Sequence, residues 1–326
     1  MQHISICCFL NHLHLHLQTI YQWSIDNNME FHSDKFELVR YQSKSSKEIQ
    51  AQSNYHSFDG TVIEEKQHVR DLGVTLSNDA TFTRHIMESC ELVKGKISWV
   101  LRTFCSRDRT SMLTLWNSLI KCHVEYCSQL WSPSTVGHIQ SLELLQRSFI
   151  RKIKGMENLS YWEQLEQLRM YSLERRRERY QIIYTWRILE GLVPNLESTP
   201  ITAVENERRG RSCIPPPLAT SAPQRIKSIR FASLSHKGPR LFNSLPSEIR
   251  NLKEVTAEQF KNKLDHYLLK IPDQPLIPNY TQYRQIDSNS IVDWSSRIQH
   301  QQRNSMVRTP HRGNGQLGSV TSGQPE

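Results

Sequence analysis

The hydrophobic residues between positions 79 and 195 recur every three or four residues, and this spacing persists over almost the whole segment. Each stretch of this kind places its apolar side chains on one face of an α-helix, which must pack against another element. The stretches cover residues 82–104, 112–124, 136–153, 161–170 and 172–192. The spacing therefore predicts a bundle of about five helices over 79–195.

Residues 18–78 carry a different pattern. After a short predicted helix at 18–28, residues 35–41 alternate between apolar and polar side chains, which predicts a strand. Asp59-Gly60 predicts a tight turn between two more strands, and 69–76 predicts a further strand. Such an antiparallel meander is too thin to fold alone. We expect a mainly α protein of the α+β class, with a small N-terminal antiparallel β meander.

The remaining segments are predicted from composition. Residues 1–17, in which His and Leu alternate from His12 to Leu17, predict an unstructured leader unrelated to the rest of the chain. Three His at this spacing could also bind a metal on one face of a strand. Residues 196–235 contain three consecutive prolines and predict an extended basic linker. Residues 236–271 predict a turn-rich clip and one more helix, and 272–326 predict a disordered tail.

Net charge and cysteine content indicate the cellular compartment and the kind of partner. The 326 residues carry a formal net charge of +9, which favours polyanionic partners. No apolar run reaches the roughly 18–20 residues that a membrane-spanning helix needs, and the N-terminus lacks the basic start of a secretory signal. Seven cysteines without a Cys-x-x-Cys pair indicate reduced thiols. We expect an intracellular protein of the cytoplasm or nucleus, neither secreted nor membrane-bound.

Eight short motifs occur in a fixed order along the chain. They are Tyr21-Gln22-Trp23, Asn27 to Phe31, Lys35-Phe36-Glu37, Val69 to Val74, Glu125 to Pro133, Leu144 to Arg147, Leu173 to Arg177 and Gly238 to Pro246. Each motif is weak alone, but their order and spacing closely resemble the back half of the reverse transcriptase of jockey-like non-LTR retrotransposons. The resemblance covers about residues 18–275.

The resemblance implies an RNA-directed DNA polymerase in which palm aspartates, including an Asp-Asp turn, hold two divalent metal ions. This sequence contains no Asp-Asp dipeptide, and the resemblance places the missing turn just upstream of Gln18. We therefore expect the end of the palm, the thumb and the region after it, without polymerase activity. No cofactor is expected in this chain, and Mg²⁺ is expected only in a full-length parent enzyme.

Two positions acquire roles through the resemblance. Lys35 matches the lysine of an Asn-x-x-Lys element and would act as a proton donor to pyrophosphate, although His32 stands where the family shows Asn. Leu72-Gly73 resembles the hairpin that supports the primer end, where a glycine allows close approach to a sugar-phosphate. The alternatives are a solvated lysine at a strand edge and a bulge in an ordinary strand.

Basic residues are the second class of candidates, because phosphate neutralisation supplies most nucleic-acid affinity. Arg147, Arg151, Lys152 and Lys154 cluster in the third helix, and Arg175, Arg176, Arg177 and Arg179 cluster in the fifth. In the fifth helix, Glu174 and Glu178 offer ion pairing on the helix surface as an alternative. The linker adds Arg208, Arg209, Arg211, Arg225, Lys227 and Arg230. The expected partner is RNA or an RNA–DNA duplex.

Tryptophans and one Cys-His pair in the helical region are interpreted as packing residues. The tryptophans Trp99, Trp116, Trp131, Trp162 and Trp186 are predicted to pack in the core rather than to stack on bases. Cys122 and His123 are likewise predicted to be packing residues, because adjacent helical residues point in different directions. The alternative to a nucleic-acid-binding role is a helical interaction module without enzymatic function, or a decayed transposon product.

Overall fold

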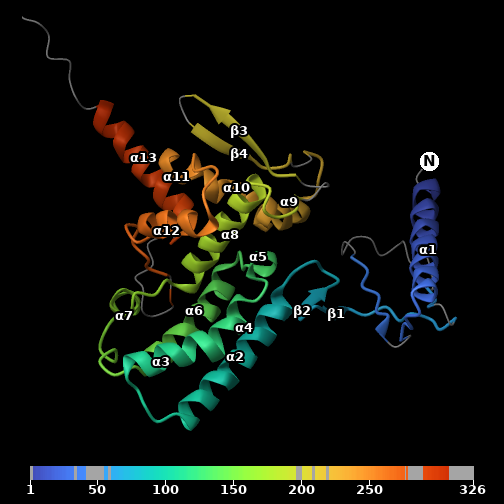
Figure 1. Cartoon of the computed structure of the whole chain (residues 1–326), viewed down its shortest axis with the longest axis horizontal. Coiled ribbons are helices and arrows are strands. Elements are labelled where there is room, and N and C mark those ends of the chain that lie inside the picture. Colours follow the sequence, from blue (N-terminus) through green and yellow to red (C-terminus); the bar gives the residue numbers. More distant parts are fainter. Residues whose placement is uncertain are drawn as a thin grey trace, which may run out of the picture.

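The computed structural model describes residues 3–32, 35–41, 55–57, 60–195, 200–207, 210–217, 220–275, 277 and 289–307. The described chain is mainly helical with two small antiparallel strand pairs, which confirms the predicted α+β class. Figure 1 shows two packed helical groups, with the first helix standing apart from both. Among the described helices, none combines the length and apolarity needed to cross a bilayer.

The N-terminal helix α1 (His3–Asp26) runs without interruption through the alternating His-Leu segment. The prediction of an unstructured leader over residues 1–17 is therefore wrong for residues 3–17. Leucine is a strong helix former, and the continuous backbone hydrogen bonding joins these residues to the short helix predicted at 18–28. No group of His, Cys, Asp or Glu within the described residues is arranged to hold a metal ion.

The predicted β meander is reduced to fragments. Residues 35–41 contribute only one bridge, Leu38 to Glu65, supported by the Lys66 N–H donating to Leu38 O at 2.8 Å. His56 and Val62 form an antiparallel bridge at the predicted hairpin, whose Phe58 and Asp59 lie outside the described residues. The strand predicted at 69–76 is in fact a hairpin of β1 (His68–Asp71) and β2 (Val74–Ser77).

The five predicted helical stretches are confirmed, with one of them divided. The elements are α2 (Thr83–Thr103), α3 (Arg109–Leu115), η2 (Trp116–Ile120), α4 (Lys121–Glu125), α5 (Ser128–Trp131), α6 (Val136–Ile150), α7 (Tyr161–Leu168) and α8 (Leu173–Leu189). The second stretch contains a π-helical turn, η2, between α3 and α4. Ser160 and Glu163 form a capping box that starts α7.

A single apolar core joins these helices. Val93 of α2, Trp116 of η2 and Phe149 of α6 are fully buried in it, and the Trp116 and Phe149 rings lie 5.3 Å apart. Trp116, Trp131 and Trp186 are buried as predicted, whereas Trp162 is half-buried. The prediction that Trp99 packs in the core is wrong, because 47% of its surface is exposed.

A second core lies around the C-terminal half of α8. It is built with β3 (Thr202–Asn206), β4 (Gly210–Ile214), α9 (Gln224–Ala232), α10 (Leu234–Asn243), α11 (Ser247–Arg250), α12 (Ala257–Leu268) and α13 (Ile291–Val307). Trp186 and Phe260 stack in this core with their centroids 4.4 Å apart. The predicted helix in this region corresponds to α12.

The predictions of an extended linker and a turn-rich clip are wrong, because this part of the chain forms strands and helices of the second group. Residues 202–206 and 210–214 form an antiparallel strand pair, and α9 and α10 follow it. Asn243 anchors β4 by accepting from Cys213 N at 2.7 Å and donating to Cys213 O at 2.8 Å. Pairing to a distant asparagine leaves no periodic signal in the local sequence, which explains why composition indicated a linker.

The prediction of a disordered tail is wrong for residues 289–307. Helix α13 begins where Glu178 of α8 accepts hydrogen bonds from Ser290 Oγ at 2.6 Å and from Ile291 N at 3.0 Å. Ser295 then donates to Ser244 O at 2.8 Å, and Ile291 is fully buried. These contacts order a segment whose composition is too polar to predict it. Residues 278–288 and 308–326 lie outside the described residues.

Candidate nucleic-acid interface

The turn between β1 and β2 presents the predicted Leu72-Gly73 pair at the molecular surface. Both residues adopt left-handed backbone angles, with φ of 44° at Leu72 and 84° at Gly73. Tyr126 Oη donates to Leu72 O at 2.8 Å, which ties the turn to the end of α4. A Cβ atom at Gly73 would lie 3.4 Å from the Tyr126 ring. The turn is therefore held in place while 83% of the Leu72 surface stays exposed.

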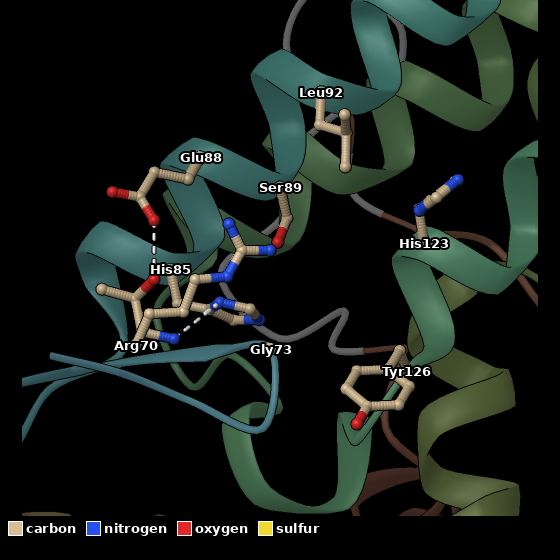
Figure 2. Close-up of a pocket in the computed structure, with 9 residues that line it drawn as sticks. Arg70, Gly73, His85, Glu88, Ser89, Leu92, His123 and Tyr126 are labelled. Carbon is tan, nitrogen blue, oxygen red and sulfur yellow. Dashed lines mark hydrogen bonds between the residues drawn. The ribbon is translucent and has the colours of Figure 1, made fainter. Parts of the chain in front are cut away.

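A hollow of about 300 Å³ lies behind this turn, between the β1–β2 hairpin, α2 and α4. Figure 2 shows Arg70 reaching from the hairpin into it, with His123 and Tyr126 on the opposite wall. The α2 wall is formed by His85, Glu88, Ser89 and Leu92, and Gly73 and Thr75 complete the lining. The hollow thus combines residues that are far apart in sequence.

The two histidines of the hollow are uncharged at neutral pH. Burial lowers the pKa of His85, whose Nδ1 accepts from Thr75 N at 3.2 Å and whose ring meets the Trp131 ring edge-on at 5.1 Å. Burial also lowers the pKa of His123, with the Lys96 charge acting in the same direction. Because Nδ1 of His85 is an acceptor, its proton resides on Nε2.

The two charged groups of the hollow differ in their hydrogen bonding and exposure. Glu88 is engaged by Arg84 Nε at 2.7 Å and by Thr75 Oγ1 at 2.7 Å, and these hydrogen bonds lower the pKa of its carboxyl. Arg70 is exposed. The hollow therefore combines one guanidinium and one carboxylate with two imidazoles and a phenol.

Lys35 does not line this hollow. It forms a single turn in which its N–H donates to His32 O at 3.0 Å, and its side chain is exposed. Nothing in the described residues tests its predicted role as a proton donor, and that role stays a prediction.

The four predicted arginines at the start of α8 are built into the fold. Arg175 is 1% exposed and donates from Nη2 to Pro272 O and Asn289 O, each at 3.0 Å. Arg177 is 4% exposed, donates to Val124 O at 3.0 Å and stacks over Trp131 at 5.2 Å. Burial lowers the pKa of Arg177. Both side chains join elements across the core and present no guanidinium to solvent.

The other two α8 arginines are paired with carboxylates from other elements. Arg176 binds Glu125 at the end of α4 and donates to Tyr180 Oη at 2.8 Å. Arg179 binds Asp265 of α12 through two hydrogen bonds of 2.5 and 2.6 Å. The sequence alternative of pairing with Glu174 and Glu178 on the helix surface is not what the structure shows.

The basic residues of α6 separate into two groups. Arg147 is buried at 9% exposure, whereas Arg151, Lys152 and Lys154 follow the end of the helix and are exposed. These three side chains have no hydrogen-bond or ion-pair partner within the described residues.

The basic residues predicted in the linker are scattered. Arg211 is buried against Glu190, at 2.5 Å, and against Leu189 O, at 3.1 Å. Arg225 donates to Asp79 O and Lys227 donates to Thr220 O at 2.7 Å. Arg230 is exposed on α9, and Arg208 and Arg209 lie outside the described residues.

Sequence reasoning missed several residues of the hollow. Arg70 and Tyr126 lie inside two of the motifs that carry the family resemblance, so the signal was present without an assigned role. His85 had no local signal, because its position depends on the contact between α2 and Trp131.

Similarity to one known protein bears on this geometry. Part of the chain is 22% identical over 154 residues to the RNA-directed DNA polymerase from mobile element jockey of Drosophila melanogaster. The matched region covers 46% of this chain and 16% of that protein, so the chain spans a small part of its relative. No family model matches the chain, and no solved structure matches it. The similarity establishes a distant relation to reverse transcriptases.

Proposed function

We propose that this chain is the thumb-like, nucleic-acid-binding part of a non-LTR retrotransposon reverse transcriptase, with the end of the palm preceding it. The observation that carries the proposal is the distant similarity to the jockey polymerase. The order of the eight motifs supports the assignment to the C-terminal region of such an enzyme. The partner is then RNA or an RNA–DNA duplex.

The β1–β2 hairpin is the part of the structure that best fits contact with a primer–template. Its turn is anchored by Tyr126 and leaves Leu72 exposed, while Gly73 has no side chain to obstruct a sugar-phosphate. Arg70 stands next to the turn and supplies a positive charge. A phosphate seated between the turn and α2 would meet this guanidinium.

Catalysis is assigned to the parent enzyme and not to this chain. Phosphoryl transfer by two metal ions needs closely placed carboxylates. In the part of the chain that the structure describes, no cluster of ligands suited to a metal ion occurs. We expect the purified chain to incorporate no nucleotide with Mg²⁺ or Mn²⁺, primer–template and nucleotides. The Mg²⁺ ions belong to the palm of a full-length enzyme, and the compartment is intracellular.

Binding of a labelled RNA–DNA hybrid, measured by fluorescence anisotropy at several salt concentrations, tests the proposal. Affinity should fall steeply as salt rises, because phosphate contacts release counterions. Arg70→Gln should weaken binding and flatten the salt slope, whereas Arg187→Gln, an exposed arginine on α8, should leave both unchanged. Absence of binding at low salt would overturn the proposal and favour a helical interaction module or a decayed product.

A further inference from the structure

Two aromatic rings are exposed together at the C-terminal end of α2. Trp99 is 47% exposed and Phe104 is 37% exposed. Their ring centroids lie 6.2 Å apart and their planes are nearly perpendicular, at 88°. A pair of large apolar rings that stays in contact with solvent is unusual for a helix whose opposite face is fully buried. The two rings meet edge to face and remain partly exposed.

The loop after these rings is held rigidly by one side chain. Arg107 donates to Leu101 O at 2.7 Å and to Ser106 O at 3.0 Å, and it also donates to Phe104 O. The Arg107 carbonyl accepts from Lys154 N at 2.8 Å. A chain of direct contacts therefore runs from the aromatic pair through Arg107 to the end of α6. The rings and the residues after α6 belong to one fixed surface.

Positive charge is in excess on this surface. The exposed side chains of Arg109, Arg151, Lys152 and Lys154 have no ion-pair or hydrogen-bond partner within the described residues. The two acidic residues in these segments keep their charges but accept hydrogen bonds from backbone N–H groups close to them. Asp108 accepts from Ser111 N at 2.9 Å and starts α3, and Glu157 accepts from Gly155 N at 3.0 Å. Four cations therefore remain available for phosphates.

We propose that this surface, formed by Trp99, Phe104, Arg109, Arg151, Lys152 and Lys154, binds single-stranded nucleic acid. Exposed aromatic rings beside unpaired cations are the features that sequence-tolerant single-strand binding uses. In a duplex the faces of the bases are stacked on one another, so exposed protein rings would find no partner except at its ends. In a single strand every base can stack, and the phosphates between them reach the four cations.

The inference deepens the proposed function and rests on it only in taking nucleic acid as the ligand. It places the duplex at the β1–β2 hairpin and the unpaired strand at the far end of α2. Figure 1 shows these two places at opposite ends of that helix. In a primer–template, the unpaired strand likewise extends away from the paired region. The two sites can therefore be weakened separately.

Binding of a fluorescein-labelled 12-nucleotide oligo(U) to the full chain tests the aromatic contribution. Trp99→Ala and Phe104→Ala should each weaken binding about tenfold, in the range found for loss of one base–aromatic stack. Trp99→Phe should restore most of the affinity. Trp23→Ala is the matched control, because Trp23 is a similarly exposed tryptophan, 52%, on the remote helix α1. Circular dichroism melting verifies that each variant is folded.

The outcomes separate this inference from the proposed function. Loss of oligo(U) binding with unchanged RNA–DNA hybrid binding in Trp99→Ala and Phe104→Ala supports a distinct single-strand surface. Wild-type oligo(U) affinity in both folded variants would overturn the inference and leave duplex binding at the hairpin untouched. Equal weakening of both ligands would overturn the separation into two sites. Failure of the wild-type chain to bind either ligand would instead overturn the proposed function.

Discussion

Helix α8 and the end of α6 carry arginine and lysine clusters that look alike in sequence and differ in the folded protein. The four arginines at the start of α8 are buried or half-buried, and their guanidinium groups are bonded to carbonyls and carboxylates of other elements. The three cations after α6 are exposed and unpaired within the described residues. The difference teaches that a charge cluster indicates a binding surface only where the fold leaves its charges without partners.

The reason for the burial on α8 is the position of that helix between two cores. Leu173 faces the first core and Trp186 the second, so the helix is surrounded over much of its circumference. A buried guanidinium has five donors to satisfy, which makes it suited to joining loose carbonyl groups at element ends. Arg175 does this for residues 272 and 289, and Arg177 does it for Val124.

The largest expected effect is on stability and concerns the buried side of the comparison. Arg177→Ala should lower the free energy of unfolding by about 4 kcal/mol, because it removes a fully buried cation and leaves Val124 O and nearby carboxylates without their partner. Urea denaturation followed by circular dichroism measures the loss. Arg187→Ala, an exposed arginine on the same helix, should change stability by less than about 0.5 kcal/mol. A similar small loss in both variants would show that Arg177 does not join α8 to α4.

The second prediction concerns the pH dependence of stability, which should come from the buried region. Burial raises the pKa of Glu143 to about 7, against an ordinary value of 4.5. Glu143 accepts from Tyr161 Oη and from Glu174 N, each at 2.7 Å. Because the folded pKa is the higher one, the stabilising contribution is complete below about pH 4.5 and is lost as pH rises through about 7.

Glu143→Gln should therefore reduce the fall in stability between pH 5 and pH 8 by about 2 kcal/mol, the order expected for a shift of this size in a fully buried group. Urea denaturation of both proteins at the two pH values measures the difference. Arg151→Gln, which leaves Glu143 and its hydrogen-bond partners in place, should keep the wild-type profile. A parallel pH profile for Glu143→Gln would contradict the burial argument.

The basic residues of α9 are intermediate between the buried arginines of α8 and the exposed cations after α6. Arg225 and Lys227 are bound to backbone carbonyls of Asp79 and Thr220, while Arg230 is exposed. Replacing all three with Gln should weaken nucleic-acid binding by a few-fold, less than the same change after α6, because two of the charges already have partners. Anisotropy titration with the single-stranded oligo(U) compares the variants. A larger loss from α9 would reverse the ranking and make α9, rather than the end of α6, the main binding surface.

The smallest expected effect is on the stability of the exposed cluster. The triple variant Arg151→Gln, Lys152→Gln and Lys154→Gln should unfold within about 0.5 kcal/mol of the wild type, because no described contact of these side chains is lost. Urea denaturation also measures this effect. A loss above about 2 kcal/mol would mean that these cations support the fold, as those of α8 do.

The helices were predictable from sequence because the apolar periodicity of α2, α6 and α8 reflects burial directly. The hairpin at Leu72-Gly73 was identified only through the family resemblance, since residues 69–76 read as one strand. Strands β3 and β4 and helix α13 could not be predicted, because Asn243 and Glu178 anchor them from distant parts of the chain. Of the basic candidates named from the sequence, Arg151, Lys152 and Lys154 are exposed, and their role in binding stays a prediction. The burial of Arg175 and Arg177 depends on tertiary packing that no local pattern encodes.

The salt dependence of nucleic-acid binding tests the central claim most directly. The log of the binding constant for a single strand should fall with the log of salt, and each lost phosphate contact should flatten the slope by about 0.7. The triple variant at Arg151, Lys152 and Lys154 should therefore lose roughly 2 from the slope. A matched triple variant of the exposed residues Arg187, Lys263 and Lys270, which removes the same charge elsewhere, should keep the wild-type slope. Equal slopes for the two triple variants would contradict the assignment of phosphate contacts to the end of α6.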